Sequence, residues 1–176
     1  MEETAAALAQ AVQSGKALYV GISSYSAPRT QTMVELLREW KIPLLIHQPS
    51  YNLLNRWVDK TGLLDTLDDS GVGCIAFTPL AQGLLTGKYL NGIPEGSRMQ
   101  KEGKKVRGLT EKMLTEANLN SLRLLNDMAH ARGQTMAQTA LSWLLKDERA
   151  TAVLLGGRRP EQPEANVQAL ANLRSN

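Results

Sequence analysis

The sequence predicts an α/β fold with a parallel sheet, on two observations. Short runs that are apolar throughout recur along the 176 residues, at 17–23, 42–50, 72–79 and 151–157, and each is followed by a stretch with helical spacing of its apolar residues. Strands that are apolar on both faces pair in parallel and are covered by helices. Four such units fit either a small doubly wound sheet or one half of an eight-stranded barrel, and length does not choose between them.

The helices are predicted from their caps and their apolar spacing. Residues 2–14 are rich in alanine and are followed by Gly15, a residue typical of the position after a helix. Ser26 offers an N-cap, and Pro28 falls in the first turn of a helix that reaches Trp40. Further helices are predicted at 62–71, 115–132, 135–146 and 164–173. We expect a single α/β unit over residues 1–176.

Composition and charge exclude nucleic acid as a partner. The chain is 43% apolar, which is enough for a buried core, and its formal charge is only +3, with acidic residues spread among the basic ones. The densest basic stretch, 98–107, contains no aromatic residue on which a base could stack. It is predicted to be a solvated loop.

The single cysteine and the hydropathy pattern predict the compartment. Cys74 rules out an internal disulfide, which fits a reducing compartment. The first residues are acidic where a signal peptide would be basic, and no apolar run approaches the roughly 20 residues that span a bilayer. We expect a cytoplasmic protein without a membrane partner.

Polar side chains follow the predicted strands at the points where they end. Ligands of parallel α/β sheets lie beyond the carboxyl ends of the strands, so these residues are expected to share one rim. Ser23 and the amide of Gln48 offer the donors and acceptors that a carboxamide needs, and Phe77 can lie against a heterocycle. The rim therefore suits a dinucleotide. The other residues at the strand ends are Ser24, His47, Pro49, Thr78, Gly156, Gly157 and Arg158.

The segment 73–89, "GCIAFTPLAQGLLTGKY", runs from a strand into a loop of small residues. Ala81 and Gly83 would let backbone N–H groups approach a pyrophosphate, and Lys88 would add a point charge. Arg158 and Arg159 precede a predicted helix and would chelate one further phosphate. An ordinary turn explains Gly83 and Gly87 equally well.

Several reactive side chains receive no role. His47 and Gln48 point to opposite faces of a strand, so Gln48 is assigned to the site and His47 to packing against a helix. Cys74 lies within an apolar strand and is expected to be an inert buried thiol. No tyrosine has a lysine and a histidine arranged to make it a general acid. No catalytic residue and no metal ligand is predicted.

Four segments, "YVGISSYS", "LLIHQPSYNLLNR", "CIAFTPLAQGLLTGKY" and "VLLGGRRPEQPEANVQAL", resemble in this order the second half of an aldo-keto reductase, in the branch related to potassium channel β-subunits. The resemblance implies a (β/α)8 TIM barrel, of which this chain would cover roughly strands five to eight as a partial barrel. It also implies hydride transfer from NADPH to a small aldehyde. By position, Ser23 and Gln48 would hold the nicotinamide carboxamide and Phe77 would lie against its ring. The remaining cofactor contacts would be Thr78, Pro79, Leu80, Gln82, Gly83, Leu84, Lys88, Gly156, Arg158, Arg159, Gln162 and Asn166.

Three positions depart from the family's pattern near the adenosine end of the cofactor. Arg158 stands where serine is usual, Pro163 where leucine is usual, and Ala165 where an acidic residue is usual. Because proline in a helix interior costs about 3 kcal/mol, the last helix is predicted to begin near Pro163. The additional arginine favours NADP over NAD.

The resemblance does not cover the family's catalytic aspartate, tyrosine, lysine and histidine, which come from its first four strands. The isolated chain is therefore predicted to be inactive. Four strands would also leave two open sheet edges, so we expect a homo-oligomer or a complementing N-terminal half as partner. The alternative is a non-catalytic module for nicotinamide nucleotide binding or oligomerisation.

Overall fold

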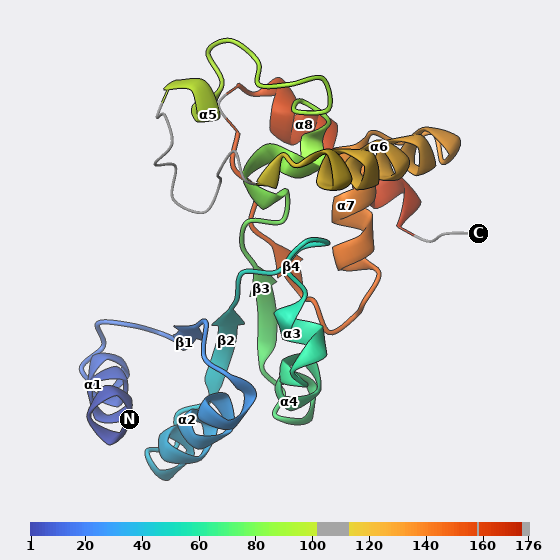
Figure 1. Cartoon of the computed structure of the whole chain (residues 1–176). Helices are drawn as coiled ribbons and strands as arrows, with labels where there is room; N and C mark the ends of the chain where they lie inside the picture. The colour runs from blue at the N-terminus through green and yellow to red at the C-terminus, as the bar shows by residue number, and fades with distance from the viewer. Residues whose placement is uncertain (102–112, 158, 174–176) are drawn as a thin grey trace. The chain divides into compact units, whose positions relative to one another are not determined.

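The computed structural model describes residues 1–101, 113–157 and 159–173, and these group into two compact units (Figure 1). The first unit contains Met1–Phe77 and Asp147–Leu154, and the second contains Thr78–Lys146 and Leu155–Asn176. Each unit is described by itself. The expectation of a single α/β unit stays a prediction.

The first unit contains a four-stranded parallel sheet whose strands follow one another in chain order, β1-β2-β3-β4. A strand order that follows the chain without reversing is that of a barrel, whereas a doubly wound sheet reverses direction. The predicted parallel α/β architecture is thus confirmed, and the strand order argues against the doubly wound alternative. The strands are β1 (Val20–Ser23), β2 (Leu44–Gln48), β3 (Gly73–Ala76) and β4 (Ala152–Val153).

The strands are shorter than the apolar runs that predicted them. Leu18 and Tyr19 lie outside β1 and are 83% and 67% exposed, so this part of the first run is not in the sheet. β4 has only two residues, although the backbone N–H of Leu154 also donates to the Ala76 carbonyl at 2.8 Å. Apolar character alone therefore overestimated strand length, because it does not report where backbone pairing ends.

Four helices belong to the first unit: α1 (Glu2–Gln13), α2 (Ala27–Glu39), α3 (Trp57–Lys60) and α4 (Leu63–Asp69). α1 packs on β1 and α2, α2 on β2 and α4, and α4 on β3. Met33, Leu37 and Leu67 are fully buried in these contacts. Of the four helices, only α3 was not predicted.

The second unit is built around α7. Thr135 caps this helix reciprocally with Gln138, since each side chain accepts a hydrogen bond from the other residue's backbone N–H. α7 packs against α6, α8, η1 and η4, and buries Leu141 and Leu144. The helical segments of this unit are η1 (Ala81–Thr86), α5 (Arg98–Lys101), α6 (Glu116–Ala131), α7 (Met136–Leu145), α8 (Glu161–Val167) and η4 (Gln168–Asn172).

Two predictions about the second unit were wrong. α8 begins at Glu161, not near Pro163. Pro163 occupies the third helical position, where the missing N–H removes no intrahelical hydrogen bond, so the cost of an interior proline does not arise. The basic stretch predicted as a loop contains α5 at its start, while residues 102–107 lie outside the described part.

Two kinds of feature are absent from the described ranges. None of the helices in residues 1–101, 113–157 and 159–173 is long and apolar enough to cross a membrane. The same residues contain no cluster of three histidine, cysteine, aspartate or glutamate side chains that could hold a metal ion.

Candidate functional site

Ser23 and Gln48 are paired neighbours at the carboxyl ends of β1 and β2. The Ser23 Oγ donates to the backbone carbonyl of Gln48 at 2.7 Å, and the Ser24 Oγ lies 3.4 Å from the Ser23 Oγ. Because the Ser23 hydroxyl proton points to the backbone, its lone pairs stay available to accept from an amide N–H. The Gln48 side chain is half-buried, and its amide can both donate and accept.

Phe77 joins the same edge of the sheet directly after β3. Its N–H donates to the Pro49 carbonyl at 2.9 Å, its carbonyl accepts from the Tyr51 N–H at 3.3 Å, and it forms an isolated bridge with Ser50. The ring is half-buried. The structure therefore brings Ser23, Gln48 and Phe77, which end or follow three adjacent strands, to one edge of the first unit.

The loop after β2 is held by side-chain hydrogen bonds that we did not predict. The Asn52 carboxamide oxygen accepts from the backbone N–H groups of Leu54 and Asn55, both at 2.9 Å. The Trp57 indole donates to the Ser50 carbonyl at 2.8 Å, and the Asn55 amide donates to the Ser50 hydroxyl at 3.2 Å. These bonds fix the backbone that pairs with Phe77. Two asparagines three residues apart in "YNLLNR" are the sequence signal for such a turn.

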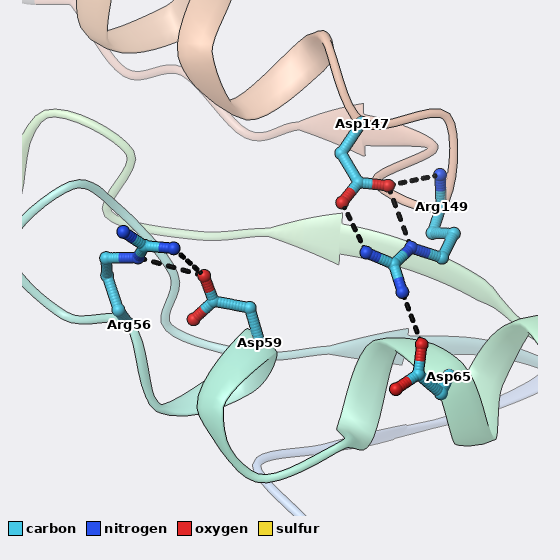
Figure 2. A network of polar contacts seen from close by, with 5 residues as sticks. All are labelled: Arg56, Asp59, Asp65, Asp147 and Arg149. Carbon is cyan, nitrogen blue, oxygen red and sulfur yellow. Dashed lines mark hydrogen bonds and ion pairs between the residues drawn. The ribbon is translucent and has the colours of Figure 1, made fainter.

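An ion-pair network lies on the helical side of this unit (Figure 2). The Arg149 guanidinium binds both carboxylate oxygens of Asp147, at 2.9 and 2.7 Å, and reaches Asp65 on α4. Arg56 pairs separately with Asp59 on α3. The carboxylates raise the pKa of Arg149, so it stays charged. The Arg149 ion pairs connect the segment before β4 to α4, so we assign them a role in stabilising the first unit.

Tyr51 is unsuited to give up a proton at neutral pH. Burial, followed by the charge of Asp59, raises the pKa of Tyr51 to about 12. The side chain is only 3% exposed. Tyr51 is therefore a poor candidate for a general acid.

The loop after Phe77, in the second unit, has an unusual backbone. Thr78, Ala81 and Gln82 have positive φ angles of 54°, 46° and 56° although none is glycine, and Gly83 follows at 102°. Left-handed conformations at ordinary residues cost free energy and recur in ligand clamps. Successive N–H groups in such turns form concavities that attract anions. The pyrophosphate loop predicted from the sequence thus has a backbone suited to that role.

Lys88 folds back across this loop. A Cβ added at Gly83 would lie 2.6 Å from both Cε and Nζ of Lys88, so the lysine passes over the glycine backbone. The ammonium also lies 4.7 Å from the centre of the Tyr89 ring. Gly83 therefore has a φ angle that favours glycine, and a side chain there would displace the end of Lys88, which exceeds the needs of an ordinary turn.

The other predicted loop residues divide by exposure. The side chains of Pro79 and Leu84 are buried in the second unit, so a cofactor could meet only their backbone. Half-buried side chains are those of Thr78, Leu80 and Gln82.

The last motif places three candidates on one side of the start of α8. Arg159 and Gln162 are exposed and one turn apart, with the Gln162 N–H donating to the Arg159 carbonyl at 3.2 Å, and Asn166 follows one turn later. The Gln138 amide donates to the Ala165 carbonyl at 2.7 Å and anchors the helix. Gly156 is exposed in the same unit, and Arg158 lies outside the described residues.

The candidates are thus divided between the units. Ser23, Gln48 and Phe77 belong to the first unit, and the other described candidates belong to the second. Within each unit the residues fit the group predicted from the sequence: a carboxamide at the strand ends, and phosphates at the left-handed loop with its lysine.

Comparison with known proteins identifies the relatives of this chain. The model of the aldo/keto reductase family matches residues 1–175. L-glyceraldehyde 3-phosphate reductase of Escherichia coli strain K12 is 83% identical over 173 residues, which are 98% of this chain and 50% of the relative. A protein of Schizosaccharomyces pombe that carries the name of a voltage-gated potassium channel β-subunit is 35% identical over 171 residues, or 97% of this chain and 50% of that one.

A solved structure shares the fold. A thermostable aldo-keto reductase, Tm1743, crystallised with the inhibitor epalrestat, superposes with a TM-score of 0.65 at 23% identity, covering 97% of this chain and 49% of that one. The chain thus spans about half the length of the relatives it matches.

Proposed function

Because this chain belongs to the aldo/keto reductase family, we propose that it forms the cofactor-binding half of a reductase that uses NADPH to reduce small aldehydes. The observation that carries this proposal is the Ser23–Gln48 pair. The Ser23 hydroxyl donates its proton to the Gln48 backbone carbonyl, and the half-buried Gln48 amide belongs to its neighbour in the sheet. Together they offer acceptors and a donor to one carboxamide. The E. coli relative's name makes L-glyceraldehyde 3-phosphate the first substrate to test. The cytoplasm is the proposed location.

In the first unit, the proposed roles concern the nicotinamide. Ser23 and Gln48 would orient the carboxamide and thereby select the face of the ring, while Phe77 would cover the other side. The bound nicotinamide supplies a hydride to the carbonyl carbon. The chain's own contribution is to position it and to exclude water.

In the second unit, the proposed roles concern the phosphates. The left-handed loop and Lys88 would bind the pyrophosphate. Arg158 and Arg159 would bind the 2′-phosphate that distinguishes NADP from NAD, with Gln162 and Asn166 towards the adenosine. Glu161 and Glu164 in the first turn of α8 oppose this with negative charge, so the preference depends on the arginines.

We propose that the chain corresponds to strands five to eight of the barrel. The family's aspartate, tyrosine, lysine and histidine would then come from a complementing first half. In support, Tyr51 and Tyr89 are buried, at 3% and 0% exposure, so neither side chain is accessible to a substrate carbonyl. The isolated chain is expected to show no reductase activity.

Titration of the chain with NADPH, followed by fluorescence, tests the cofactor site. Gln48→Leu removes one amide and should weaken binding about tenfold, the equivalent of one hydrogen bond to the ligand. Gln31→Leu, at an exposed position of α2, is the matched control and should bind as the parent does. Equal affinities for the parent and Gln48→Leu would show that Gln48 is not in the site.

Complementation tests the half assignment. The chain is mixed with each half of the E. coli relative, produced separately, and NADPH oxidation with L-glyceraldehyde 3-phosphate is measured. Activity is expected with the amino-terminal half alone. Activity restored by the carboxyl-terminal half instead would reverse the assignment.

A non-catalytic nucleotide-binding or oligomerisation module is the second candidate function. The burial of Tyr51 and Tyr89 is also compatible with this function, since neither hydroxyl can donate a proton at the surface. Binding of NADPH by a defined homo-oligomer, without turnover in any half-barrel mixture, would support this reading over the enzyme.

A further inference from the structure

His47 lies beneath the Ser23–Gln48 pair, in a fully buried position. Its strand register aligns it with Ile22 on β1 and Cys74 on β3, both also buried. The ring is 0% exposed, and its Nε2 lies 3.1 Å from both the backbone nitrogen and the backbone oxygen of Tyr25. Within the described residues, Nδ1 has no hydrogen-bond partner. The prediction that His47 only packs against a helix missed this contact.

One ring nitrogen cannot accept and donate at the same time. With its proton on Nδ1, the neutral ring accepts from the Tyr25 N–H through Nε2. Once protonated, Nε2–H can only donate to the Tyr25 carbonyl, and the Tyr25 N–H loses its acceptor. Protonation of His47 would therefore exchange its bond to the Tyr25 N–H for a bond to the Tyr25 carbonyl and leave the N–H without this acceptor.

The surroundings of His47 favour the neutral ring at neutral pH. Burial lowers the pKa of His47, partly offset by the Tyr25 carbonyl. Cys74, beside it on β3, stays an uncharged thiol because burial and Asp147 raise its pKa to about 11. The Arg29 guanidinium lies 4.5 Å from the centre of the Tyr25 ring, so a cation also borders the residue that His47 contacts.

Tyr25 is connected to the site by a strained residue. Ser24, between Ser23 and Tyr25, has a φ of +59°. Such a conformation persists only while its surroundings hold it. The Tyr25 contact with His47 supplies one such restraint, and the Ser23 hydrogen bond to Gln48 supplies the next.

We infer that His47 is a positioning residue that holds the Ser23–Tyr25 segment to β2 as a latch, and that its protonation in acid exchanges the bond to the Tyr25 N–H for one to the Tyr25 carbonyl and so shifts the segment beside the Ser23–Gln48 pair. The effect on cofactor rests on the proposed function, because it assumes that this pair binds the carboxamide. Nucleotide binding would then weaken with acid, through a residue that does not touch the nucleotide.

Nuclear magnetic resonance of the full chain tests the latch without cofactor. The ring nitrogen shifts should report an unprotonated Nε2 at neutral pH, and the amide signals of residues 23–25 should move with the same midpoint as the ring. His47→Gln keeps an acceptor near Nε2 and should hold these signals constant with pH. His47→Leu should shift them at every pH. The inference would be overturned if the amide signals of residues 23–25 did not change as the ring titrates. A proton on Nε2 at neutral pH would overturn it as well.

Titration with NADPH as the probe connects the latch to the site. Affinity should fall about fivefold as the ring becomes protonated below neutral pH, the equivalent of one hydrogen bond, and His47→Gln should abolish this dependence. Thr30→Val, another fully buried polar position, is the control and should keep it. A chain that binds no NADPH at any pH refutes the proposed function, while the amide signals still decide the latch. A pH dependence unchanged in His47→Gln would overturn the coupling.

Discussion

The backbone of Gly83 lies directly under the end of the Lys88 side chain, with no space for even a methyl group between them. The distances from a Cβ built at Gly83 are 2.6 Å to both Cε and Nζ of Lys88. The φ of 102° at Gly83 is itself one that other residues rarely adopt. The loop therefore depends on glycine for the position of its one cation.

Gly83→Ala tests this dependence. The substitution should lower the free energy of unfolding by about 1 kcal/mol through backbone strain, and should also push Lys88 away from the loop because the lysine can move more easily than the backbone. NADPH affinity should fall with it. Denaturant unfolding and NADPH titration measure the two effects.

The control for Gly83→Ala is Gly92→Ala. Gly92 has a similar φ of 109°, but nothing lies within 4 Å of an added Cβ. It should therefore show the strain without the loss of affinity. Equal affinities for the two variants would mean that the position of Lys88 is irrelevant to binding.

A second glycine prediction concerns the start of α8. A Cβ at Gly157 would stand 2.7 Å from Cδ of Pro163 and 3.3 Å from the Arg159 carbonyl oxygen. Neither can move as a lysine does, so Gly157→Ala should cost about 1–3 kcal/mol of stability. Gly156→Ala has no neighbour within 4 Å and should be nearly neutral. The double variant Gly157→Ala with Pro163→Ala should recover stability. If it does not, contact with Pro163 is not the cause of the loss in Gly157→Ala. Thermal unfolding of the parent, the two single glycine variants and the double variant measures these effects.

Much of the fold was predictable because its signals are local. Four apolar runs identified the four strands, and a capping residue with a proline in the first turn, at Ser26 and Pro28, located α2 to within a residue. The residues at the strand ends were predictable for the same reason. Parallel strands bring their carboxyl ends together whatever their loops do, so Ser23, Gln48 and Phe77 meet at one edge.

The missed features depend on details that local sequence patterns do not report. α3 has only four residues and is held by the Trp57 indole on Ser50, which no periodicity of that length reveals. The Tyr25 contact joins His47 to a residue 22 positions away. The predicted start of the last helix was wrong because the cost of an interior proline was applied to Pro163. This residue lies in the first turn of α8, where that cost does not arise.

Gln134 is predicted to hold the end of the second unit together. Its buried amide donates to the Ser142 hydroxyl at 3.2 Å and to the Asn172 carbonyl at 3.0 Å, and its oxygen accepts from the Thr139 hydroxyl at 3.1 Å. Gln134→Leu removes all three bonds from a buried site, so the free energy of unfolding should fall by about 2–3 kcal/mol. Gln31→Leu, at an exposed position of α2, should change the free energy of unfolding by less than about 0.5 kcal/mol. A small loss in Gln134→Leu, measured by denaturant unfolding, would show that water replaces the network.

Acid should destabilise the chain through His47. The folded-state pKa of His47 lies below its ordinary value of 6.5, so the unfolded chain binds this proton more tightly than the folded chain does. The free energy of unfolding is therefore highest above pH 6.5, begins to fall as pH drops through 6.5, and stops falling from this source below the folded-state pKa. His47→Gln should flatten that part of the pH profile, whereas replacing the exposed His130 by glutamine should leave the His47 contribution in place. Denaturant unfolding at a series of pH values makes the measurement. A profile for His47→Gln that parallels the parent would mean that the ring binds its proton equally well in both states, contrary to its burial.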